Sequence, residues 1–534
     1  MRRWIKSSLV VLLATLLLSL PAGYDTNHFA IWMFSTAFIH SLAWSLAILW
    51  VVHRRPILMQ GFFAVIFLFF FLETTCYLLF GTRINETVMT IVMQTDLQEA
   101  SSFANSYLIS WTALVILVVG CLLFYLMLRW VKVQRLEPLY QPWVSRILVV
   151  VTMVFGFVLP SISLPWTNHG YNTVEGLYHA IDFVEESHSD LDQIVTMLGR
   201  IQVYQQPEQA DAPVIVLVIG ESYNKYHAAL YGYPLQTTPR LSAEKNLVVF
   251  EHAYTPVCYT HSAMRYIFSL KSCDRRQAGD SLQYVLFPAV FKKAGYRVGY
   301  FDNQFTQMKV GFRDYSSGYF MSPSSVSHQC FDVRNTFIDP YDGPFVEQCQ
   351  GSFLKAGKSL NIIHLYGQHL EANKRYPKEY AYFTGADIQR EDLDEGERQL
   401  VAEYDNATRY NDMVLGMILD AFRQQDVVLV YLSDHGDNIY DGPQRRYGRP
   451  AGGLYDEESK RNIREIPFII WWSDVFAAKR PEVVETIRQR SRRTVCLDDV
   501  AYLLFDLGGI SSNFSCPSRS VIHTNYRPHR IAME

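Results

Sequence analysis

The chain has 534 residues, a formal net charge of −4 and a pI of about 6.4, so it is too long for a single domain and lacks the basic excess of a nucleic-acid-binding protein. Apolar residues make up 49% of the sequence, but their long runs gather in residues 1–165, whereas the charges concentrate after residue 170. This division predicts a membrane domain that is followed by an outer domain.

Five apolar segments in the first part are long enough to cross a bilayer, which takes about 17–25 residues. They lie at 7–23, 29–52, 57–80, 106–128 and 145–165. The first is also typical of a signal peptide, but LSLPAG places Leu where cleavage needs a small residue, so we expect a retained helix. Glu73 is the main ionisable residue in these segments, which disfavours a transporter. We therefore predict a five-span α-helical membrane domain over residues 1–165.

The charges of the loops predict their side of the membrane. Basic residues gather in alternate loops and at the amino terminus, at Arg2, Arg3, Lys6, Arg54, Arg55, Arg129, Lys132, Arg135 and Arg146. By the positive-inside rule these parts are cytoplasmic. Five crossings then place everything after residue 165 outside the cytoplasm.

The cysteines fit an oxidising compartment. Two of them fall in membrane segments, and the outer part keeps an even number, at Cys258, Cys273, Cys330, Cys349, Cys496 and Cys516. An even set of this kind predicts disulfides, although the sequence leaves their pairing open. We expect the nearest-neighbour set, 258–273, 330–349 and 496–516.

Residues 166–210 connect the two parts. Their apolar residues recur at three and four positions, which predicts an amphipathic helix that either lies along the membrane surface or packs as a linker, before the polar stretch QQPEQADAP. From residue 211 to 534, short apolar strands alternate with helices. Strands are expected at 214–220, 247–254, 296–302, 360–366, 426–432 and 466–472, and helices near 261–270, 283–294, 396–424, 481–491 and 497–507. This alternation predicts an α/β domain with a mostly parallel sheet covered on both faces.

Polar side chains follow two of the expected strands at once. Glu221 comes after VIVLVIG, and Asp434 and His435 come after VVLVYLS. The carboxyl ends of strands in an α/β sheet are where ligands and metals bind. Two carboxylates and an imidazole suit Zn²⁺, with Mn²⁺ as the alternative. Taken alone, the Asp-His pair is also typical of an ordinary loop turn.

Several motifs resemble the phosphoethanolamine transferases of the alkaline phosphatase–sulfatase superfamily. They are the strand motif Gly220–Ser222 with Leu230–Tyr233 and Thr237–Pro239, the segment HLYGQHLEANKRYP at 364–377, the helix AEYDNATRYNDMVL and the second metal motif YLSDHGDN. Five membrane helices before an outer catalytic domain also fit that family. The resemblance covers nearly the whole chain and implies an alkaline phosphatase/sulfatase-like fold.

The resemblance also implies site residues. The family nucleophile is a threonine about 39 residues after the glutamate of the strand motif, and Thr260 stands there. It would be a metal ligand with Glu221, Asp434 and His435, although a threonine that opens a helix is also typical of an N-cap. His369 matches the histidine that contacts the donor headgroup.

A loop of the membrane domain is expected to contact the donor as well. Thr95 and Glu99 match residues that reach the ethanolamine, and their spacing places both on one face of a helix. An ordinary polar loop helix has the same pattern. The family partner asparagine is replaced by Ile91.

The implied activity is transfer of phosphoethanolamine from phosphatidylethanolamine to lipid A, lipopolysaccharide core or another envelope glycan, through a phospho-threonine intermediate. The implied place is the bacterial inner membrane, with residues 211–534 as a periplasmic catalytic domain. The acceptor, the choice between zinc and manganese and the oligomeric state stay open.

Three departures from the family pattern limit this prediction. Tyr447, in QRRYGRP, stands where a second family histidine falls, and DNQFTQMK at 302–309 lacks the family serines. Cys258 and Cys273 bracket Thr260 differently from the usual disulfide. Headgroup recognition or the acceptor is therefore expected to differ from that of the lipid A enzymes.

Other functions fit less well. Phosphoglycerol transfer to another glycan or polymer shares the five helices and the metal-bound threonine, but the Leu-x-Gly-Tyr and Arg-Tyr-Pro motifs favour the ethanolamine branch. A sulfatase needs Pro two residues after its modified Cys or Ser, and Thr260 holds that place after Cys258. A third alternative is a non-enzymatic protein whose outer domain only binds envelope components. Its only support is Tyr447, which stands in place of a family histidine.

Overall fold

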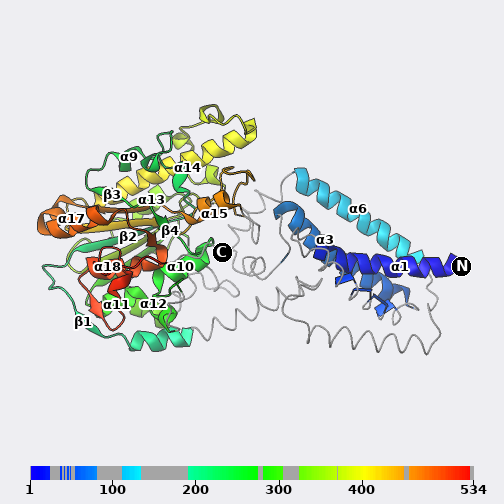
Figure 1. Ribbon diagram of the computed structural model, residues 1–534, viewed down its shortest axis with the longest axis horizontal. Helices are drawn as coiled ribbons and strands as arrows, with labels where there is room; N and C mark the ends of the chain where they lie inside the picture. Colours follow the sequence, from blue (N-terminus) through cyan, green and yellow to red (C-terminus); the bar gives the residue numbers. More distant parts are fainter. Residues whose placement is uncertain are drawn as a thin grey trace. The chain divides into compact units, whose positions relative to one another are not determined.

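The computed structural model describes residues 2–23, 55–80, 84, 111–133, 191–274, 281–304, 324–369, 371–449 and 456–529, with short pieces between 37 and 49. The chain forms two compact units (Figure 1). One comprises residues 1–184 with 450–454, and the other comprises residues 185–449 with 455–534.

The first unit is helical where it is described. Its helices are α1 (Arg2–Ser19), η1 (Leu20–Gly23), α3 (Pro56–Phe80) and α6 (Trp111–Val133). They share a small apolar core that includes the fully buried Val10, Phe63 and Val131. Among the residues that the structure describes, two helices, at Pro56–Leu79 and Trp111–Lys132, are long and apolar enough to cross a membrane. The expected segment 145–165 and most of 29–52 lie outside the described residues, so the five-span prediction is not confirmed.

The second unit is built on a seven-stranded sheet. Its strands lie in the order β3 (Leu247–Val249), β9 (Phe468–Trp472), β8 (Val427–Ser433), β2 (Val214–Gly220), β7 (Ser359–His364), β5 (Arg297–Asp302) and β6 (Val333–Arg334). From β8 to β6 all neighbours are parallel, but β9 runs antiparallel to both β8 and β3. The sheet is therefore mixed, which corrects the prediction of a mostly parallel sheet. Apolar strands buried on both faces look alike in the sequence whichever way they run.

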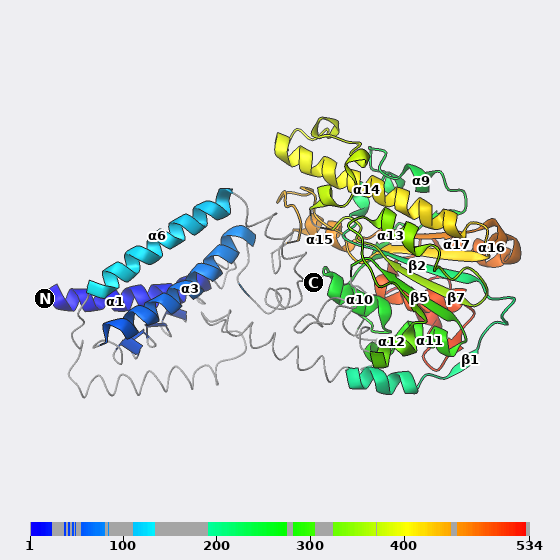
Figure 2. The ribbon, with the colours of Figure 1, turned by 180° about the vertical axis from the view of Figure 1, so that it is seen from behind.

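Helices cover both faces of the sheet (Figure 2). On β2, Ile215, Leu217 and Ile219 belong to one apolar core, together with side chains of α10 (Thr260–Phe268), α11 (Phe287–Lys293) and α18 (Val500–Leu507). The alternate residues of β2 belong to a second core with α13 (Asp342–Cys349) and α14 (Glu395–Phe422). Because successive side chains of a strand point to opposite faces, the sheet separates the two cores.

Shorter elements complete the second unit. Two small sheets pair β1 (Val203–Gln205) with β11 (Ser511–Ser512), and β4 (Ala253–Tyr254) with β10 (Val495–Cys496). The remaining α-helices are α9 (Pro239–Ser242), α12 (Ser324–Cys330), α15 (Glu457–Arg464), α16 (Asp474–Lys479) and α17 (Pro481–Arg490). Of the connecting segment 166–210, residues 191–199 are helical, and Ile194, Met197 and Leu198 are buried in the first core. This part packs as a linker helix; residues 166–190 lie outside the described residues.

The cysteines do not lie as the nearest-neighbour pairing expects. Cys330 belongs to one core and Cys349 to the other, so the sheet stands between them and the 330–349 pair is wrong. The sulfur atoms of Cys273 and Cys496, which were assigned to different pairs, lie 3.6 Å apart. Proximity along the sequence did not identify these neighbours because the loop after α10 and strand β10 meet only in the folded chain.

Candidate metal centre and nucleophile

The predicted ligands Glu221, Asp434 and His435 meet at one edge of the sheet. Strands β2 and β8 are parallel neighbours, and their register aligns Gly220 with Ser433, so the residues that follow each strand emerge side by side. All three ligand side chains are fully buried. One ligand atom from each lies within 4.8 Å of the others. The structure thus assembles the predicted cluster from segments more than 200 residues apart.

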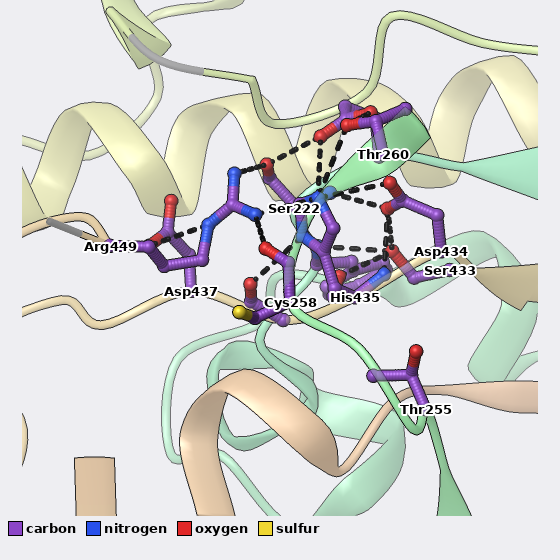
Figure 3. A network of polar contacts seen from close by, with 12 residues as sticks. Ser222, Thr255, Cys258, Thr260, Ser433, Asp434, His435, Asp437 and Arg449 are labelled. Atoms are coloured by element: carbon purple, nitrogen blue, oxygen red, sulfur yellow. Dashed lines mark hydrogen bonds and ion pairs between the residues drawn. The ribbon is translucent and has the colours of Figure 1, made fainter. Parts of the chain in front are cut away.

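Thr260 joins this cluster (Figure 3). Its hydroxyl donates a hydrogen bond of 2.9 Å to Oε2 of Glu221, and its Oγ1 lies 3.2 Å from Nε2 of His435. Thr260 is the first residue of α10, and Tyr259 holds the N-cap position, so the N-cap alternative for Thr260 is wrong. The nine-residue helix points its amino end at the cluster, where free N–H groups and the helix dipole favour an anion.

Ser222 forms hydrogen bonds with both carboxylates of the cluster, those of Glu221 and Asp434. Its backbone is left-handed, with φ of 56°, a conformation that a serine adopts only at a cost. In this conformation its hydroxyl donates a 2.7 Å hydrogen bond to Oε1 of Glu221, and its N–H donates one of 3.1 Å to Oδ1 of Asp434. Ser222 therefore helps to orient the carboxylates of Glu221 and Asp434.

A glycine lets the neighbouring loop approach Glu221 closely. Gly367 has φ of +54°, and a Cβ placed on it would lie 2.8 Å from the backbone oxygen of Glu221. Gln368 donates its N–H to that same oxygen at 3.0 Å. Behind the loop, buried Asp342 accepts the N–H groups of Tyr366 and Gly367, both at 2.8 Å. Burial raises the pKa of Asp342, and these N–H groups oppose the rise.

The cluster fits a metal ion. Burial first, and then the charge of Arg449, lower the pKa of His435 to about 3, so its ring is neutral and offers a lone pair. Oδ2 of Asp434 is buried and accepts no hydrogen bond from the described residues. Buried carboxylates are strongly unfavourable without a compensating cation. Two carboxylates, an imidazole nitrogen and a hydroxyl oxygen form the set of oxygen and nitrogen ligands that Zn²⁺ accepts.

The site predicted from the sequence did not include a group of residues that surround Glu221. Gln304 donates to Oε2 of Glu221 at 3.3 Å and to the carbonyl of Leu365 at 2.8 Å, and it lies 3.1 Å from Nε2 of His364. The other ring nitrogen of His364 lies 3.0 Å from the Asp302 carboxylate. His364 ends β7 and Asp302 ends β5, so the strand-end rule that selected Glu221 would have found both.

Arg449 is another residue of the site that the sequence motifs did not identify. Its guanidinium lies inside the site, within 2.7 Å of Nε2 of His435, and it donates to Ser222 Oγ at 3.1 Å. Tyr447, two residues earlier, instead packs its ring against Tyr440 with centroids 5.3 Å apart. The family pattern singled out this segment only for its missing histidine, although the segment carries the basic group that enters the site.

The remaining predicted residues fall in two groups. His369 has its pKa lowered to about 4, mainly by burial, while the charges of Glu221, Arg375 and Arg449 also act on it. The predicted contact of His369 with the donor headgroup stays a prediction. Thr95 and Glu99 lie outside the described residues, so the predicted donor contacts in the membrane domain are not tested.

Comparison with known proteins agrees with this geometry. A family profile described as Sulfatase matches residues 213–510, more than half of the chain. The chain is 26% identical to phosphoethanolamine transferase EptC of Escherichia coli K12 over 488 residues, which cover 84% of this chain and 80% of that protein. It is 24% identical to phosphoethanolamine transferase CptA of Salmonella typhimurium, with the same coverage.

Solved structures carry the comparison to the fold. The periplasmic domain of Escherichia coli EptC in complex with zinc has a TM-score of 0.51 and 28% identity, and covers 61% of this chain and 90% of that one. The integral membrane protein lipooligosaccharide phosphoethanolamine transferase A of Neisseria meningitidis has a TM-score of 0.64 over 98% of this chain and 99% of that one; at 18% identity it shows the fold alone. The chain therefore belongs to the sulfatase family, and within it the chain is similar to the phosphoethanolamine transferases.

Proposed function

We propose that the protein transfers phosphoethanolamine from phosphatidylethanolamine to an envelope acceptor, which is lipid A, lipopolysaccharide core or another glycan. The observation that carries the proposal is the Thr260 hydroxyl, hydrogen-bonded to Glu221 and 3.2 Å from Nε2 of His435. The phosphoethanolamine transferases among its relatives support this choice of group. The position of Thr260 also argues against sulfatase chemistry, because a threonine holds the nucleophile's place and cannot be matured as Cys or Ser can.

The proposed reaction has two steps. In the first, the Thr260 oxygen forms a bond to phosphorus, the bond between phosphorus and the diacylglycerol oxygen breaks, and the hydroxyl proton ends on diacylglycerol. In the second, an acceptor oxygen forms a bond to phosphorus, the bond between phosphorus and the Thr260 oxygen breaks, and the acceptor's hydroxyl proton ends on Thr260. The amino end of α10 stabilises negative charge on the phosphoryl oxygens in both steps.

Glu221, Asp434, His435 and Thr260 would hold the metal, which we propose to be zinc, with manganese as the alternative. A bound zinc ion acts as a Lewis acid that lowers the pKa of a coordinated hydroxyl and neutralises phosphoryl charge. The residues themselves orient the reacting atom: the hydrogen bond to Glu221 fixes the Thr260 oxygen, and Ser222 fixes the Glu221 carboxylate. His369 would hydrogen-bond to the donor near the same atom.

The membrane domain would present the lipid donor. We propose that residues 1–165 span the bacterial inner membrane five times and that residues 211–534 act in the periplasm. Residues 166–210 would connect these two domains. Thr95 and Glu99 would contact the ethanolamine group, since a carboxylate suits an ammonium ion. The two apolar helices of membrane-spanning length support this arrangement.

The test uses the full-length protein in vesicles that contain phosphatidylethanolamine. The peptide that contains Thr260 is expected to gain a phosphoethanolamine increment by mass spectrometry, and diacylglycerol is expected to appear in equal amount. Thr260→Ala should abolish both signals, and Thr260→Ser, which keeps a hydroxyl, should retain part of them. An unmodified Thr260 peptide together with continued transfer by Thr260→Ala would overturn the proposal.

A further inference from the structure

Arg449 reaches Ser222, Cys258 and His435 from one side of the site (Figure 3), yet nothing in the reaction described so far uses it. Its side chain is 14% exposed. The guanidinium lies 2.7 Å from Nε2 of His435 and 3.1 Å from Oγ of Ser222, and it also donates to the carbonyl of Cys258. Its Nε lies 3.5 Å from a carboxylate oxygen of Asp437. Four residues from three segments of the fold thus hold one cation beside the proposed nucleophile.

One of these contacts conflicts with metal binding. A guanidinium has only donors and stays protonated in proteins, so Arg449 must donate to the lone pair of His435 Nε2. The same lone pair is the one that a metal ion needs. His435 can serve Arg449 or the metal, but not both. Metal binding therefore releases one N–H of Arg449, whereas the contacts with Ser222, Cys258 and Asp437 can persist.

The released donor lies next to the nucleophile. Nε2 of His435 is 2.7 Å from Arg449 and 3.2 Å from the Thr260 oxygen, so both groups approach the same atom. When Thr260 attacks a phosphorus atom, the phosphoryl oxygens come to lie between Thr260 and Arg449. A planar guanidinium matches two phosphoryl oxygens at once, and its charge opposes the negative charge that they carry.

We propose that Arg449 binds the phosphoryl oxygens of the donor phosphodiester and of the phospho-Thr260 intermediate, with the N–H that would be free once His435 held the zinc instead of accepting from Arg449. The inference rests on the proposed function, which it extends by a catalytic residue. Asp437 and Ser222 would hold the guanidinium in place while its other edge faces the substrate. It also explains how this chain manages with Tyr447 in place of a histidine: the same segment supplies a permanent cation two residues later.

The test compares Arg449→Gln and Arg449→Lys with wild type, all as full-length protein in detergent. Arg445→Gln is the matched control, because Arg445 lies in the same segment, loses the same charge and pairs with Glu397 on the surface. Zinc is titrated into metal-free protein, inorganic phosphate is titrated into zinc-loaded protein, and transfer from phosphatidylethanolamine is assayed separately.

Zinc should bind Arg449→Gln as tightly as wild type or more tightly, because no cation competes for His435. Phosphate should bind the zinc-loaded variant about tenfold more weakly or worse, as expected for a lost charge-assisted hydrogen bond. Transfer should fall about 100-fold to 1,000-fold, the usual effect of removing one transition-state donor. Arg449→Lys should recover part of phosphate binding, and Arg445→Gln should match wild type throughout.

Weaker zinc binding by Arg449→Gln, or unchanged phosphate binding, would overturn the proposal. The first result would assign Arg449 a structural or ligand-supporting role, and the second would place phosphate elsewhere. Phosphate binding does not depend on which donor lipid or acceptor is used. A wild-type protein that binds phosphate through Arg449 but does not transfer phosphoethanolamine would therefore refute the proposed function and leave this inference standing.

Discussion

Gly367→Ala should damage the site although it replaces none of the proposed catalytic or metal-binding side chains. The added methyl group meets two difficulties. At φ of +54° an alanine is strained by about 1–2 kcal/mol, and its Cβ would lie 2.8 Å and 2.9 Å from the backbone O and N of Glu221. Backbone atoms cannot move aside as a flexible side chain can, so overpacking adds about 1–3 kcal/mol. We expect a total destabilisation of about 2–5 kcal/mol and weaker zinc binding, because relief of the clash displaces Glu221.

Gly232→Ala is the matched control. Gly232 also has a positive φ, +97°, but a Cβ there meets no atom within 4 Å. It should show only the backbone strain, about 1–2 kcal/mol, with unchanged zinc affinity. Denaturant unfolding followed by tryptophan fluorescence measures the stabilities, and calorimetric titration measures zinc binding. Equal destabilisation of the two variants, or unchanged zinc affinity in Gly367→Ala, would refute the close-packing argument.

Three further predictions follow from buried groups. Burial alone lowers the pKa of His227, but the carboxylates of Asp405 and Asp441, at 2.7 Å and 3.2 Å, raise it to about 10 from an ordinary 6.5. The ion pairs should therefore stabilise the fold fully below pH 6.5, and this stabilisation should be lost as the pH rises through about 10. Thermal unfolding at a series of pH values measures the loss, which the His227→Asn variant should not show. Cys273 and Cys496, with sulfur atoms 3.6 Å apart, should be joined in a non-reducing peptide map of protein from an oxidising compartment; recovery of both as free thiols would exclude this pair. Chelation should abolish transfer and lower the unfolding midpoint, and zinc should restore both, because three buried ligands are left without their cation; activity that survives chelation would argue against a metal centre.

The elements of the outer domain were predictable because local sequence carries their signals. The buried run VIVLVIG became β2, and VVLVYLS became β8, with bounds within a residue of those expected. The polar residues directly after these strands lie together in the candidate metal cluster, since parallel strands end at the same edge. Thr260 needed more than local reasoning, and the spacing known from a resembling family supplied it.

The sequence alone determined the buried strands, the helices between them and the polar groups that follow the strands. These features are local because each depends on the pattern of apolar and polar residues within one short segment. Tertiary structure decided the antiparallel course of β9, the meeting of Cys273 with Cys496 and the entry of Arg449 into the site. Each of these depends on which distant segments become neighbours. That choice is made by the packing of two cores against one sheet, and no single stretch of sequence contains it.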